Sequence, residues 1–482
     1  MSRARLLQFS LLFVGLALAP LALLLLSDFA GMDTLGLVMV LGAVCALPTV
    51  LDRLGGRFEL FEAINVVCYF SFVQFGLATL YLLYNPPAAY DSRVLPYLNV
   101  SLLYCIIGFG SMVYGYFLVR RLGDVHHAPE RVIRGSVWIA VLFGVGAAGQ
   151  FAERLSEQQM YESSRVGGLV SAFCQLEQLA LFGYFLLLFL WFSGMATATQ
   201  KLLLCGAVIP YELLQVYFRL GSKSFCLTIL GLPIVAYWYA KKRLPPGVVI
   251  VFALLAVFLV FPFYNTYRRT SHQYSTTTRI SMTVDTLSGH TPEAYAEESL
   301  YMVGRRMALI NSVAVIVRET GRSVDFQHGK TIALAAISLA IPRFLWPEKP
   351  IINLGREFAR EFHILPRFDQ WTWVAITAIG ELYWNFGLPG IIVGMFVIGV
   401  ILQLVYRHLG QEGSRDPIHL AMYVSLIPSF LNLDGNIASW LAGLVRAVII
   451  YSALDLALQG FRGIRHAPST LPPSEPAPGE AF

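Results

Sequence analysis

Hydrophobic residues occur along this chain in long, almost uninterrupted runs that short polar segments separate. A helix needs about 17–25 apolar residues to cross a bilayer, and twelve runs reach or approach that length. The pattern therefore predicts an all-α, polytopic integral membrane protein with about twelve transmembrane helices. These runs are residues 6–26, 34–51, 60–84, 97–119, 135–152, 168–192, 202–219, 224–240, 246–263, 386–406, 417–433 and 436–459.

One connection between the apolar runs is much longer than the others, and it divides the chain into four parts. Nine predicted helices over residues 1–263 precede a polar loop at 264–370. The last helices follow over residues 371–460. The tail at 461–482 is rich in proline, and we expect it to be disordered.

The long loop has helical and apolar segments of its own. In residues 291–320, Thr291 is a predicted N-cap, Pro292 takes the first helical position, and apolar residues recur at helical spacing. This pattern predicts one long amphipathic helix. The apolar stretch 331–342 is too short to span a bilayer, so we expect it to lie in the membrane interface or to dip in and return.

The apolar stretch at 371–406 is too long for a single membrane helix. The sequence Gly-Leu-Pro-Gly at 387–390 predicts a kink or a break there. The break places Glu381, Tyr383 and Asn385 in the outer half of the stretch, at or just inside the membrane surface. A carboxylate at that depth is costly unless it is paired or functional. Glu381 is therefore predicted either to pair with an arginine of the loop and fix the fold, or to act as a general base.

The composition supports a membrane protein, and the distribution of charge predicts its orientation across the membrane. Hydrophobic residues make up 56% of the chain and charged residues 13%, against about 25% charged residues in soluble proteins. With a cytoplasmic N-terminus, the short inner loops hold sixteen Lys and Arg residues and the short outer loops hold five. Because basic residues gather on the cytoplasmic side, both termini are predicted inside and the 264–370 loop outside. The basic residues of the loops between membrane helices then account for the net charge of +5, which does not indicate a nucleic-acid partner.

The first apolar run raises the alternative of a cleaved signal peptide. Its apolar core spans roughly 20 residues, which is longer than the 7–15 residues of a signal-peptide core. We therefore expect residues 6–26 to form an uncleaved first span.

The external loop contains arginine far more often than lysine, in a ratio of eleven to two. Arginine makes bidentate bonds to phosphate oxygens, which lysine does not. Each arginine taken alone is also suited to an ion pair with one of the ten acidic residues of the loop. The cluster as a whole favours phosphate binding near the lipid headgroups. The arginines predicted to bind phosphate are Arg268, Arg279, Arg305 and Arg343, the last of which lies between Pro342 and Pro347 where an apolar segment ends.

Other kinds of site chemistry lack their sequence patterns. The histidines of the loop have no metal-ligand spacing, and no Asp-x-Asp pair occurs. A Gly-x-Ser-x-Gly nucleophile motif is also missing, and all six cysteines fall in apolar runs. We therefore expect no bound metal and no cofactor.

Three sequence stretches together resemble a known family. They are IPRFLWPEKP at 341–350, Gly-Arg-Glu-Phe at 355–358 and AIGELYWNFGLPG at 378–390. These stretches resemble the bacterial oligosaccharide repeat-unit polymerases of the O-antigen polymerase type, which are lipid-linked C-type glycosyltransferases of the O-antigen ligase-like superfamily. The layout of about twelve spans with one large external loop late in the chain is similar too. The motif resemblance covers roughly residues 264–396.

The resemblance implies metal-independent, inverting transfer of a growing saccharide from undecaprenyl diphosphate to a new lipid-linked repeat unit. The reaction would take place on the periplasmic face of the bacterial inner membrane, for O-antigen, exopolysaccharide or capsule synthesis. Membrane lipids and a chain-length regulator protein are expected partners. In this interpretation Glu381 is the catalytic base, and the arginines bind the diphosphate. The predicted substrate contacts are Tyr383, Asn385 and Arg356.

Two other functions share some of these features. An O-antigen ligase would have a similar fold and donor but would transfer the saccharide to a lipid A core. A transporter of polysaccharides or lipid-linked oligosaccharides would have pseudo-repeated halves and short loops on both sides. The single long loop and the absence of an internal repeat disfavour the transporter.

Overall fold

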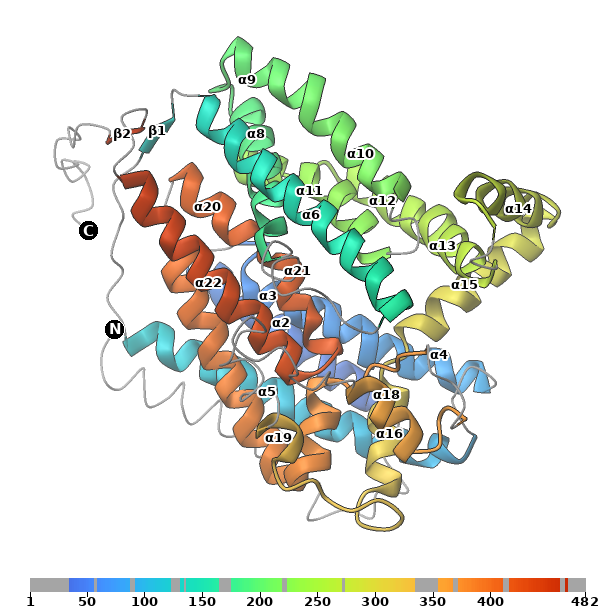
Figure 1. Ribbon diagram of the computed structural model, residues 1–482. Helices are drawn as coiled ribbons and strands as arrows, with labels where there is room; N and C mark the ends of the chain where they lie inside the picture. Colours follow the sequence, from blue (N-terminus) through green and yellow to red (C-terminus); the bar gives the residue numbers. More distant parts are fainter. Residues whose placement is uncertain are drawn as a thin grey trace, which may run out of the picture.

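The computed structural model describes residues 34–55, 59–86, 92–122, 131–133, 136–163, 175–218, 223–270, 274–333, 354–366, 372–410, 416–459 and 464–466 (Figure 1). The regular secondary structure of this part of the chain is helical apart from two three-residue strands, β1 (Arg131–Ile133) and β2 (Ile464–His466), which pair antiparallel, and one isolated bridge between Thr320 and Val324. Strand β2 lies within the tail at 461–482, and the disorder expected for that tail stays a prediction.

Short connections join most of the successive helices along the chain. The α-helices are α2 (Thr34–Leu54), α3 (Ala63–Ser71), α4 (Ala78–Tyr84), α5 (Leu98–Leu122), α6 (Val137–Ser163), α8 (Gln178–Phe192), α9 (Ala198–Leu203), α10 (Ile209–Phe218), α11 (Lys223–Lys241), α12 (Pro246–Leu255), α13 (Phe261–Arg269), α14 (Thr276–Ser288), α15 (Pro292–Met307), α16 (Ile310–Glu319), α18 (Leu354–Glu361), α19 (Ala378–Val405), α20 (Pro417–Val424), α21 (Ile427–Leu431) and α22 (Ile437–Gln459). The π-helical segments are η2 (Phe72–Leu77), η6 (Leu204–Val208), η7 (Ala256–Val260) and η8 (Tyr406–Gly410), and the 3-10 segments are η4 (Ser92–Tyr97), η5 (Gln175–Glu177) and η9 (Asn432–Asp434).

Six helical stretches among the described residues are long and apolar enough to cross a membrane, and each coincides with a predicted span. They are Thr34–Leu54, Ala63–Tyr84, Ser92–Arg121, Pro246–Arg269, Ala378–Leu409 and Ile437–Leu458. Five other predicted spans overlap α6, α8, α9 with α10, α11, and α20 with α21, which are not both long and apolar enough by the same measure. The predicted span at 6–26 lies outside the described residues. An all-helical protein with membrane-length helices is confirmed, and the number twelve stays a prediction.

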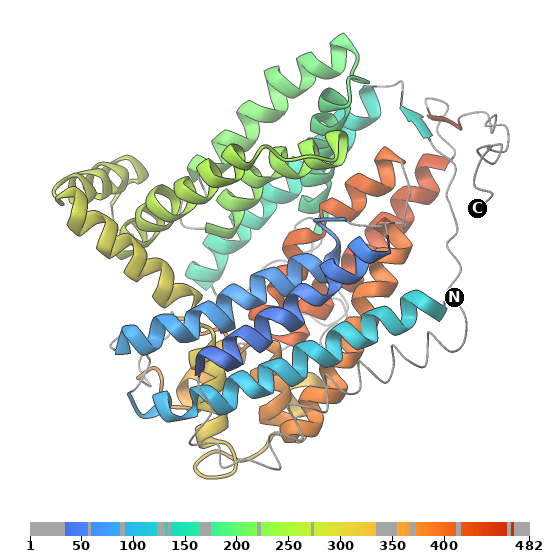
Figure 2. The ribbon, with the colours of Figure 1, turned by 180° about the vertical axis from the view of Figure 1, so that it is seen from behind.

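Helices α5 and α19 pack with their backbones in direct contact. A Cβ atom at Gly399 would lie 1.9 Å from the backbone oxygen of Met112, and one at Gly115 would lie 2.3 Å from that of Phe396. Small residues allow helices in a membrane to approach this closely. Helix α2 lies beside α5 and also packs on α3 (Figure 2).

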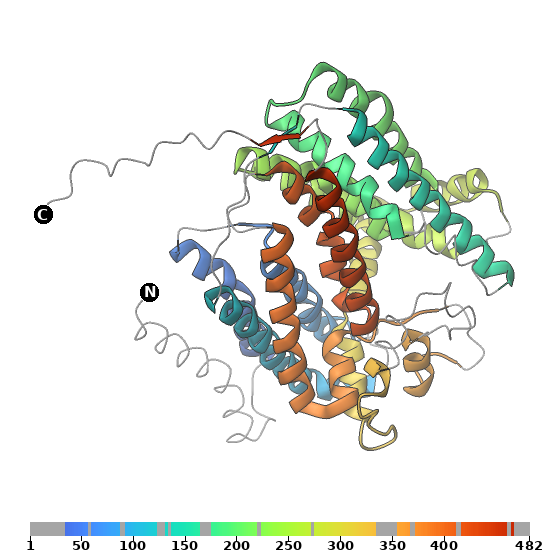
Figure 3. The same ribbon diagram turned by 60° about the vertical axis from the view of Figure 1, so that its left-hand side comes forward.

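A second group of helices contains α6, α8 and α11. Glycine again permits a close approach, because a Cβ atom at Gly146 would lie 2.0 Å from the backbone nitrogen of Ala180 on α8. Helices α19–α22 lie between this group and the helices α2–α5 (Figure 3). Helix α20 packs on α8, while α19 packs on α5 and α21 on α3. The core is therefore shared by helices from both ends of the chain.

Contacts between distant segments join the loops that were predicted to lie inside. Arg120 pairs with Asp52 at 2.7 Å and with Glu62 at 3.2 Å, and all three side chains are almost completely buried. Lys242 pairs with Glu59. Strand β1, from the loop after α5, pairs with β2 after α22. These connections therefore meet at one end of the helices. This is expected if successive spans cross the membrane in opposite directions.

Contacts at the other end join segments that were predicted to lie outside. Tyr81 of α4 donates a hydrogen bond to the carbonyl oxygen of Tyr301 at 3.2 Å. Arg322, which follows α16, binds the hydroxyl of Tyr97 before α5. The described part of residues 264–370, which we call the external segment after its predicted side, therefore packs onto the ends of the N-terminal helices.

The predicted single helix over 291–320 is wrong, because the structure has two helices there. Helix α15 begins as predicted, with Thr291 as N-cap and Pro292 at its first position. It ends at Met307, and α16 continues at an angle of 47°. Residues 310–316 of α16 are all buried, and α16 packs against α5 and α19. The external loop thus inserts a helix into the bundle. Helix α13 continues to Arg269, past the predicted start of this loop at residue 264.

The predicted break at 387–390 is confirmed. Gly387 has φ 65° and ψ −153°, a backbone conformation that interrupts α19. The two halves fold back on each other, because a Cβ atom at Gly394 would lie 2.2 Å from the side chain of Leu382. Ile379, Ile391 and Met395 then meet beside Gly108 in the middle of α5. The first half of α19 therefore folds back against the second half, and for this shape we call it the re-entrant helix.

Candidate functional site

Glu381 lies on the first turn of α19 and is completely buried. Its Oε1 accepts a hydrogen bond from the hydroxyl of Thr331 at 2.9 Å, and its Oε2 accepts one from the backbone N–H of Ile437 at 2.7 Å. The second bond satisfies a free N–H group at the start of α22 and places negative charge at the positive end of that helix. The carboxylate therefore joins the external segment, α19 and α22. Of its two predicted roles, this geometry favours fixing the fold, with Thr331 and Ile437 in place of an arginine.

Asn385 extends this junction by one helical turn. Its side-chain nitrogen donates to the hydroxyl of Thr331 at 2.7 Å and to the carbonyl of Glu381 at 2.8 Å. Its side-chain oxygen accepts from the N–H of Gly329 at 2.9 Å. The carbonyls of Trp384 and Asn385 also accept from Gln327 and His328. Residues 327–331 are therefore held against the first half of α19 by backbone and side-chain bonds.

Arg343 and the stretch 341–350 lie outside the described residues. The chain leaves the junction at Ala333 and returns at Leu354, the start of α18. Arg356 on α18 lies over the ring of Trp373, 5.4 Å from its centroid. Phe358 and Phe362 pack on Trp384, with ring centroids 6.4 Å and 5.2 Å apart. Both ends of the segment that carries Arg343 are thus anchored near the Glu381 junction.

Tyr383 faces the opposite side of the re-entrant helix. Its ring stacks on Tyr104 of α5, with centroids 5.2 Å apart, and lies 6.4 Å from Phe326. These contacts attach the re-entrant helix to α5. Tyr383 and Glu381 therefore take part in different contacts, although the sequence placed them in one site.

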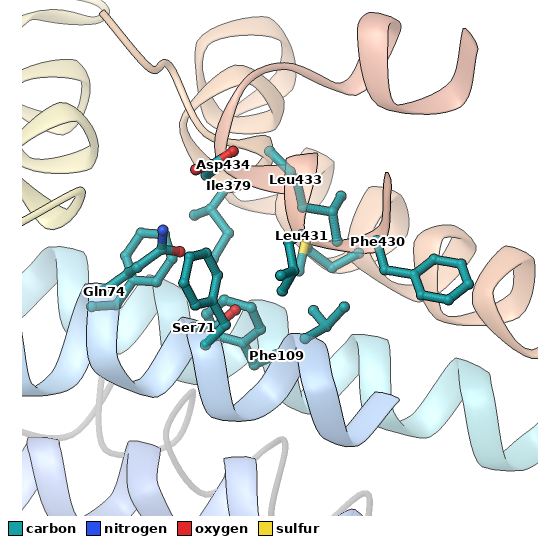
Figure 4. A pocket seen from close by; sticks show the side chains of 13 residues that line it. Ser71, Gln74, Phe109, Ile379, Phe430, Leu431, Leu433 and Asp434 are labelled. Carbon is teal, nitrogen blue, oxygen red and sulfur yellow. The ribbon is translucent and has the colours of Figure 1, made fainter. Parts of the chain in front are cut away.

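The start of the re-entrant helix borders a small internal cavity (Figure 4). Thr377, the N-cap of α19, has φ 68°, which is rare for a β-branched residue. The cavity holds about 20 Å³ between Gln74, Phe109, Ile379 and Asp434. Ligand pockets usually hold about 300–1,000 Å³, so the cavity has room for water and not for a sugar or a lipid.

Arg268 and Arg306 meet at one tyrosine where α13 ends. Arg268 donates to the hydroxyl of Tyr264 at 2.8 Å, and Arg306 of α15 contacts the same oxygen at 3.4 Å. Each guanidinium carbon lies 5.6 Å from the centroid of that ring. Within the described ranges, neither arginine has a carboxylate partner. Two positive charges thus converge on a neutral group, and both side chains are exposed.

The other two predicted arginines have different surroundings. Arg279 is buried, donates to the carbonyl of Tyr267 at 2.9 Å and lies 3.9 Å from the centroid of its ring. It therefore attaches α14 to α13. Arg305 is exposed and interacts electrostatically with Tyr81 of α4. Neither is placed at the Tyr264 hydroxyl with Arg268.

The structure adds residues that the sequence analysis did not select. Thr331 holds Glu381 and Asn385, and Tyr264 gathers Arg268 and Arg306. Arg306 is one of the eleven arginines of the predicted cluster. It differs from its neighbour Arg305 only in the side of α15 from which its side chain extends. No local sequence motif marks Thr331 or Tyr264. Their roles follow only from contacts with residues that are distant in the sequence. No group of three or more His, Cys, Asp or Glu side chains among the described residues is arranged to hold a metal.

Comparison with known proteins gives one match. A family described as a domain of unknown function (DUF8712) matches residues 153–410, more than half of the 482-residue chain. No curated protein and no solved structure matches the chain. The matched range includes the arginine pair at Tyr264 and the re-entrant helix with Glu381. On this match, the chain belongs to the DUF8712 family.

Proposed function

We propose that this protein polymerises oligosaccharide repeat units linked to undecaprenyl diphosphate, by inverting glycosyl transfer that needs no metal ion. The polymer would serve as O-antigen, exopolysaccharide or capsule. One observation carries the proposal: Arg268 and Arg306 converge on Tyr264 without a carboxylate partner among the described residues. An exposed pair of like charges at the end of an apolar helix is suited to a lipid-linked anion.

The chemistry of glycosyl transfer gives these arginines a role. When the bond between sugar and diphosphate breaks, negative charge develops on the leaving group. Fixed guanidinium groups stabilise this charge without reorganisation during the reaction. Arg343, which lies outside the described residues, is proposed as a further phosphate-binding arginine because the sequence places it between two prolines where an apolar segment ends.

As the acceptor oxygen bonds to the anomeric carbon and the bond to the diphosphate breaks, the acceptor hydroxyl loses a proton, which passes to water or is taken up by the released undecaprenyl diphosphate. Both oxygens of Glu381 already accept hydrogen bonds, and the side chain has no exposed surface. We therefore propose that Glu381 positions the segment leading to Arg343 and does not itself remove the proton. Asn385 would share this positioning role through Thr331.

We place the protein in the bacterial inner membrane, with the 264–370 segment in the periplasm and both termini in the cytoplasm. The excess of basic residues in the loops at the opposite end supports this direction. A site at the outer end admits polyprenyl tails from the lipid while the sugars stay in water.

Deletion of the gene tests the class of reaction. A polymerase mutant is expected to attach single repeat units to the lipid core, and the glycan profile on a gel would show this. Complete loss of the saccharide would instead indicate a ligase or a flippase and would contradict the proposal.

Removing both charges at Tyr264 tests the site. One hydrogen bond to a charged group contributes about 1.5–3 kcal/mol, so Arg268→Gln combined with Arg306→Gln should lower polymerisation at least ten- to a hundredfold, roughly. Polymer length and amount would be measured at equal protein levels. Arg269→Gln changes an exposed neighbour on α13, so it is the control and should have little effect. Normal polymer from the double variant would rule out this site.

Independence from metal ions is a separate expectation. Polymerisation by the purified protein should continue in EDTA. Loss of activity that a divalent cation restores would mean that a metal, and not arginine alone, stabilises the leaving group.

One observation favours transport of a lipid-linked saccharide as a second candidate function. Transporter sites are often built from broken helices, and α19 is broken at Gly387. Proteoliposomes containing the protein and a fluorescent lipid-linked saccharide would separate the two functions. Transfer of the label across the bilayer without polymer would favour the transporter.

A further inference from the structure

The cavity at the start of the re-entrant helix is lined by two polar side chains that have no partner for a hydrogen bond. Ser71 and Gln74 are only 7% and 5% exposed, and no hydrogen bond among the described residues involves either side chain. Both lie near the middle of the candidate span Ala63–Tyr84, where the bilayer offers no water to replace a missing partner. A buried amide or hydroxyl without a partner costs free energy, so we expect both groups to bind a polar ligand in the cavity.

Interrupted helices meet at this cavity. Ile379 belongs to the first turn of the re-entrant helix, and Leu431 and Asp434 lie where the chain passes from α21 through η9 toward α22. Gln74 lies in the π-helical segment η2, an irregular turn of a kind that is frequent at functional sites. In membrane transporters, interrupted helices typically form the ion sites, because their unwound segments leave oxygen atoms that a regular helix would use for its own hydrogen bonds.

The polar groups around the cavity are suited to a cation. Figure 4 shows the polar ends of Gln74, Ser71 and Asp434 on one side of the cavity. Phe430 and Leu431 lie on the other side. The carboxylate of Asp434, which also interacts with another group of the protein, adds a negative charge to the amide and hydroxyl oxygens. In a region of low dielectric constant, a positive ion gains more from this carboxylate than a water molecule does.

The size of the cavity restricts the kind of ion. Its volume of about 20 Å³ admits one water-sized ligand, and a sodium ion without its hydration shell is smaller than a water molecule. Mg²⁺ usually keeps several bound waters, and Ca²⁺ takes about 6–8 oxygen ligands, for which this cavity has no room. No histidine, cysteine or second carboxylate occurs among the described residues that line it, so the ligands preferred by transition metals are missing there.

We propose that the cavity binds one sodium ion through oxygen atoms of Ser71, Gln74 and Asp434. The ion links η2 to η9. The segment that contains η9 also holds the start of α19, because the N–H group of Thr377 donates to the carbonyl oxygens of Asp434 and Gly435, both at 3.2 Å. A bound ion therefore stabilises the re-entrant helix. The inference does not depend on the proposed function, and it revises the expectation of no bound metal for a monovalent ion only.

Sodium binding by the purified full-length protein tests the proposal. The protein in detergent and choline chloride would be incubated with radioactive sodium, and the bound label would be measured against increasing concentrations of unlabelled NaCl. One saturable site is expected. KCl should displace the label less effectively than NaCl does, because the larger ion fits the small cavity less well. The absence of saturable binding would mean that the cavity holds water only, and it would overturn the proposal.

The melting temperature gives a second readout. With sodium at about ten times its Kd, the ratio of folded to unfolded protein should rise about elevenfold. The protein should therefore melt a few degrees higher in NaCl than in choline chloride of equal ionic strength. Equal melting temperatures in the two salts would contradict a stabilising ion. Neither readout depends on whether the protein polymerises saccharide.

Variants of the three oxygen ligands assign the ion to the cavity. Gln74→Leu and Asp434→Asn should each weaken sodium binding roughly tenfold or more, the effect of losing one contact with a charged group. Ser71→Ala is the mildest change and should weaken binding less. All three variants should also lose part of the sodium-dependent rise in melting temperature. Unchanged binding in these variants would place the ion elsewhere and overturn the assignment.

Matched controls separate the loss of a ligand from damage to the fold. Gln403→Leu and Ser111→Ala change buried residues of α19 and α5 that do not line the cavity, and Asp285→Asn changes an exposed carboxylate of α14. All three should bind sodium normally, and weaker binding in them as well would contradict the assignment. Melting in choline chloride would confirm that each ligand variant is folded. If Asp434→Asn does not fold, the other two ligand variants still test the site.

Discussion

At the residue scale, buried polar groups in this protein hold separate segments together. Glu381 is fully buried, yet each of its oxygens accepts a hydrogen bond from a group on another segment. A buried carboxylate without such partners would be strongly destabilising. The sequence identified Glu381 through its depth in an apolar stretch. It did not identify Thr331 and Ile437, because they lie 50 and 56 positions away.

Substitution of Glu381 measures how much this junction contributes to the free energy of unfolding. Glu381→Gln keeps one acceptor oxygen but places an amide group against a second donor, so we expect the free energy of unfolding to fall by about 1.5–3 kcal/mol. Glu381→Ala leaves both donors without an acceptor and should cost more. Thermal unfolding of the purified protein in detergent would report both changes. Glu357→Gln on the exposed face of α18 is the control, and an unchanged melting temperature for Glu381→Ala would contradict the structural role.

At the element scale, local signals in the sequence predicted helix starts and breaks better than helix directions. The Thr291 cap, the Pro292 start and the break at Gly387 are confirmed. The bend between α15 and α16 has no glycine or proline at Ala308 or Leu309 to announce it. It follows from the burial of α16 against α5 and α19, which are distant parts of the chain. Tertiary packing therefore determines this bend, which the helical pattern alone did not predict.

The break at Gly387 gives a prediction about one element. Its φ of 65° and ψ of −153° lie in a region that essentially only glycine adopts. Gly387→Ala should lower the free energy of unfolding by about 1–3 kcal/mol, even though the nearest atom to the new Cβ would be 3.7 Å away. Gly110→Ala in α5 has no atom within 4 Å and an ordinary helical backbone, so it should be neutral or slightly stabilising. Equal unfolding temperatures for the two variants would mean that the break is not strained.

At the scale of the whole molecule, the arginine-rich external segment does not behave as one cluster. Arg268 and Arg306 share Tyr264, Arg279 attaches α14 to α13, and Arg305 is exposed without taking part in either contact. The sequence predicted the residue type and the region, since arginine outnumbers lysine there. It did not predict which arginines meet, because neighbours on α15 point in directions about 100° apart, as the helical repeat of about 3.6 residues requires.

The direction of the whole molecule across the membrane is the last prediction. The loops containing Glu59, Arg120 and Lys242 meet at one end, and the segments containing Tyr97 and Arg322 meet at the other. Because the first end carries the excess of basic residues, it should face the cytoplasm. A cysteine at exposed Ser288 should react with a membrane-impermeant maleimide in intact cells, whereas one at exposed Arg243 should react only after lysis. The unmodified protein controls for its native cysteines. The reverse pattern of labelling would place the arginine pair at Tyr264 in the cytoplasm, where the proposed lipid-linked donor is not available.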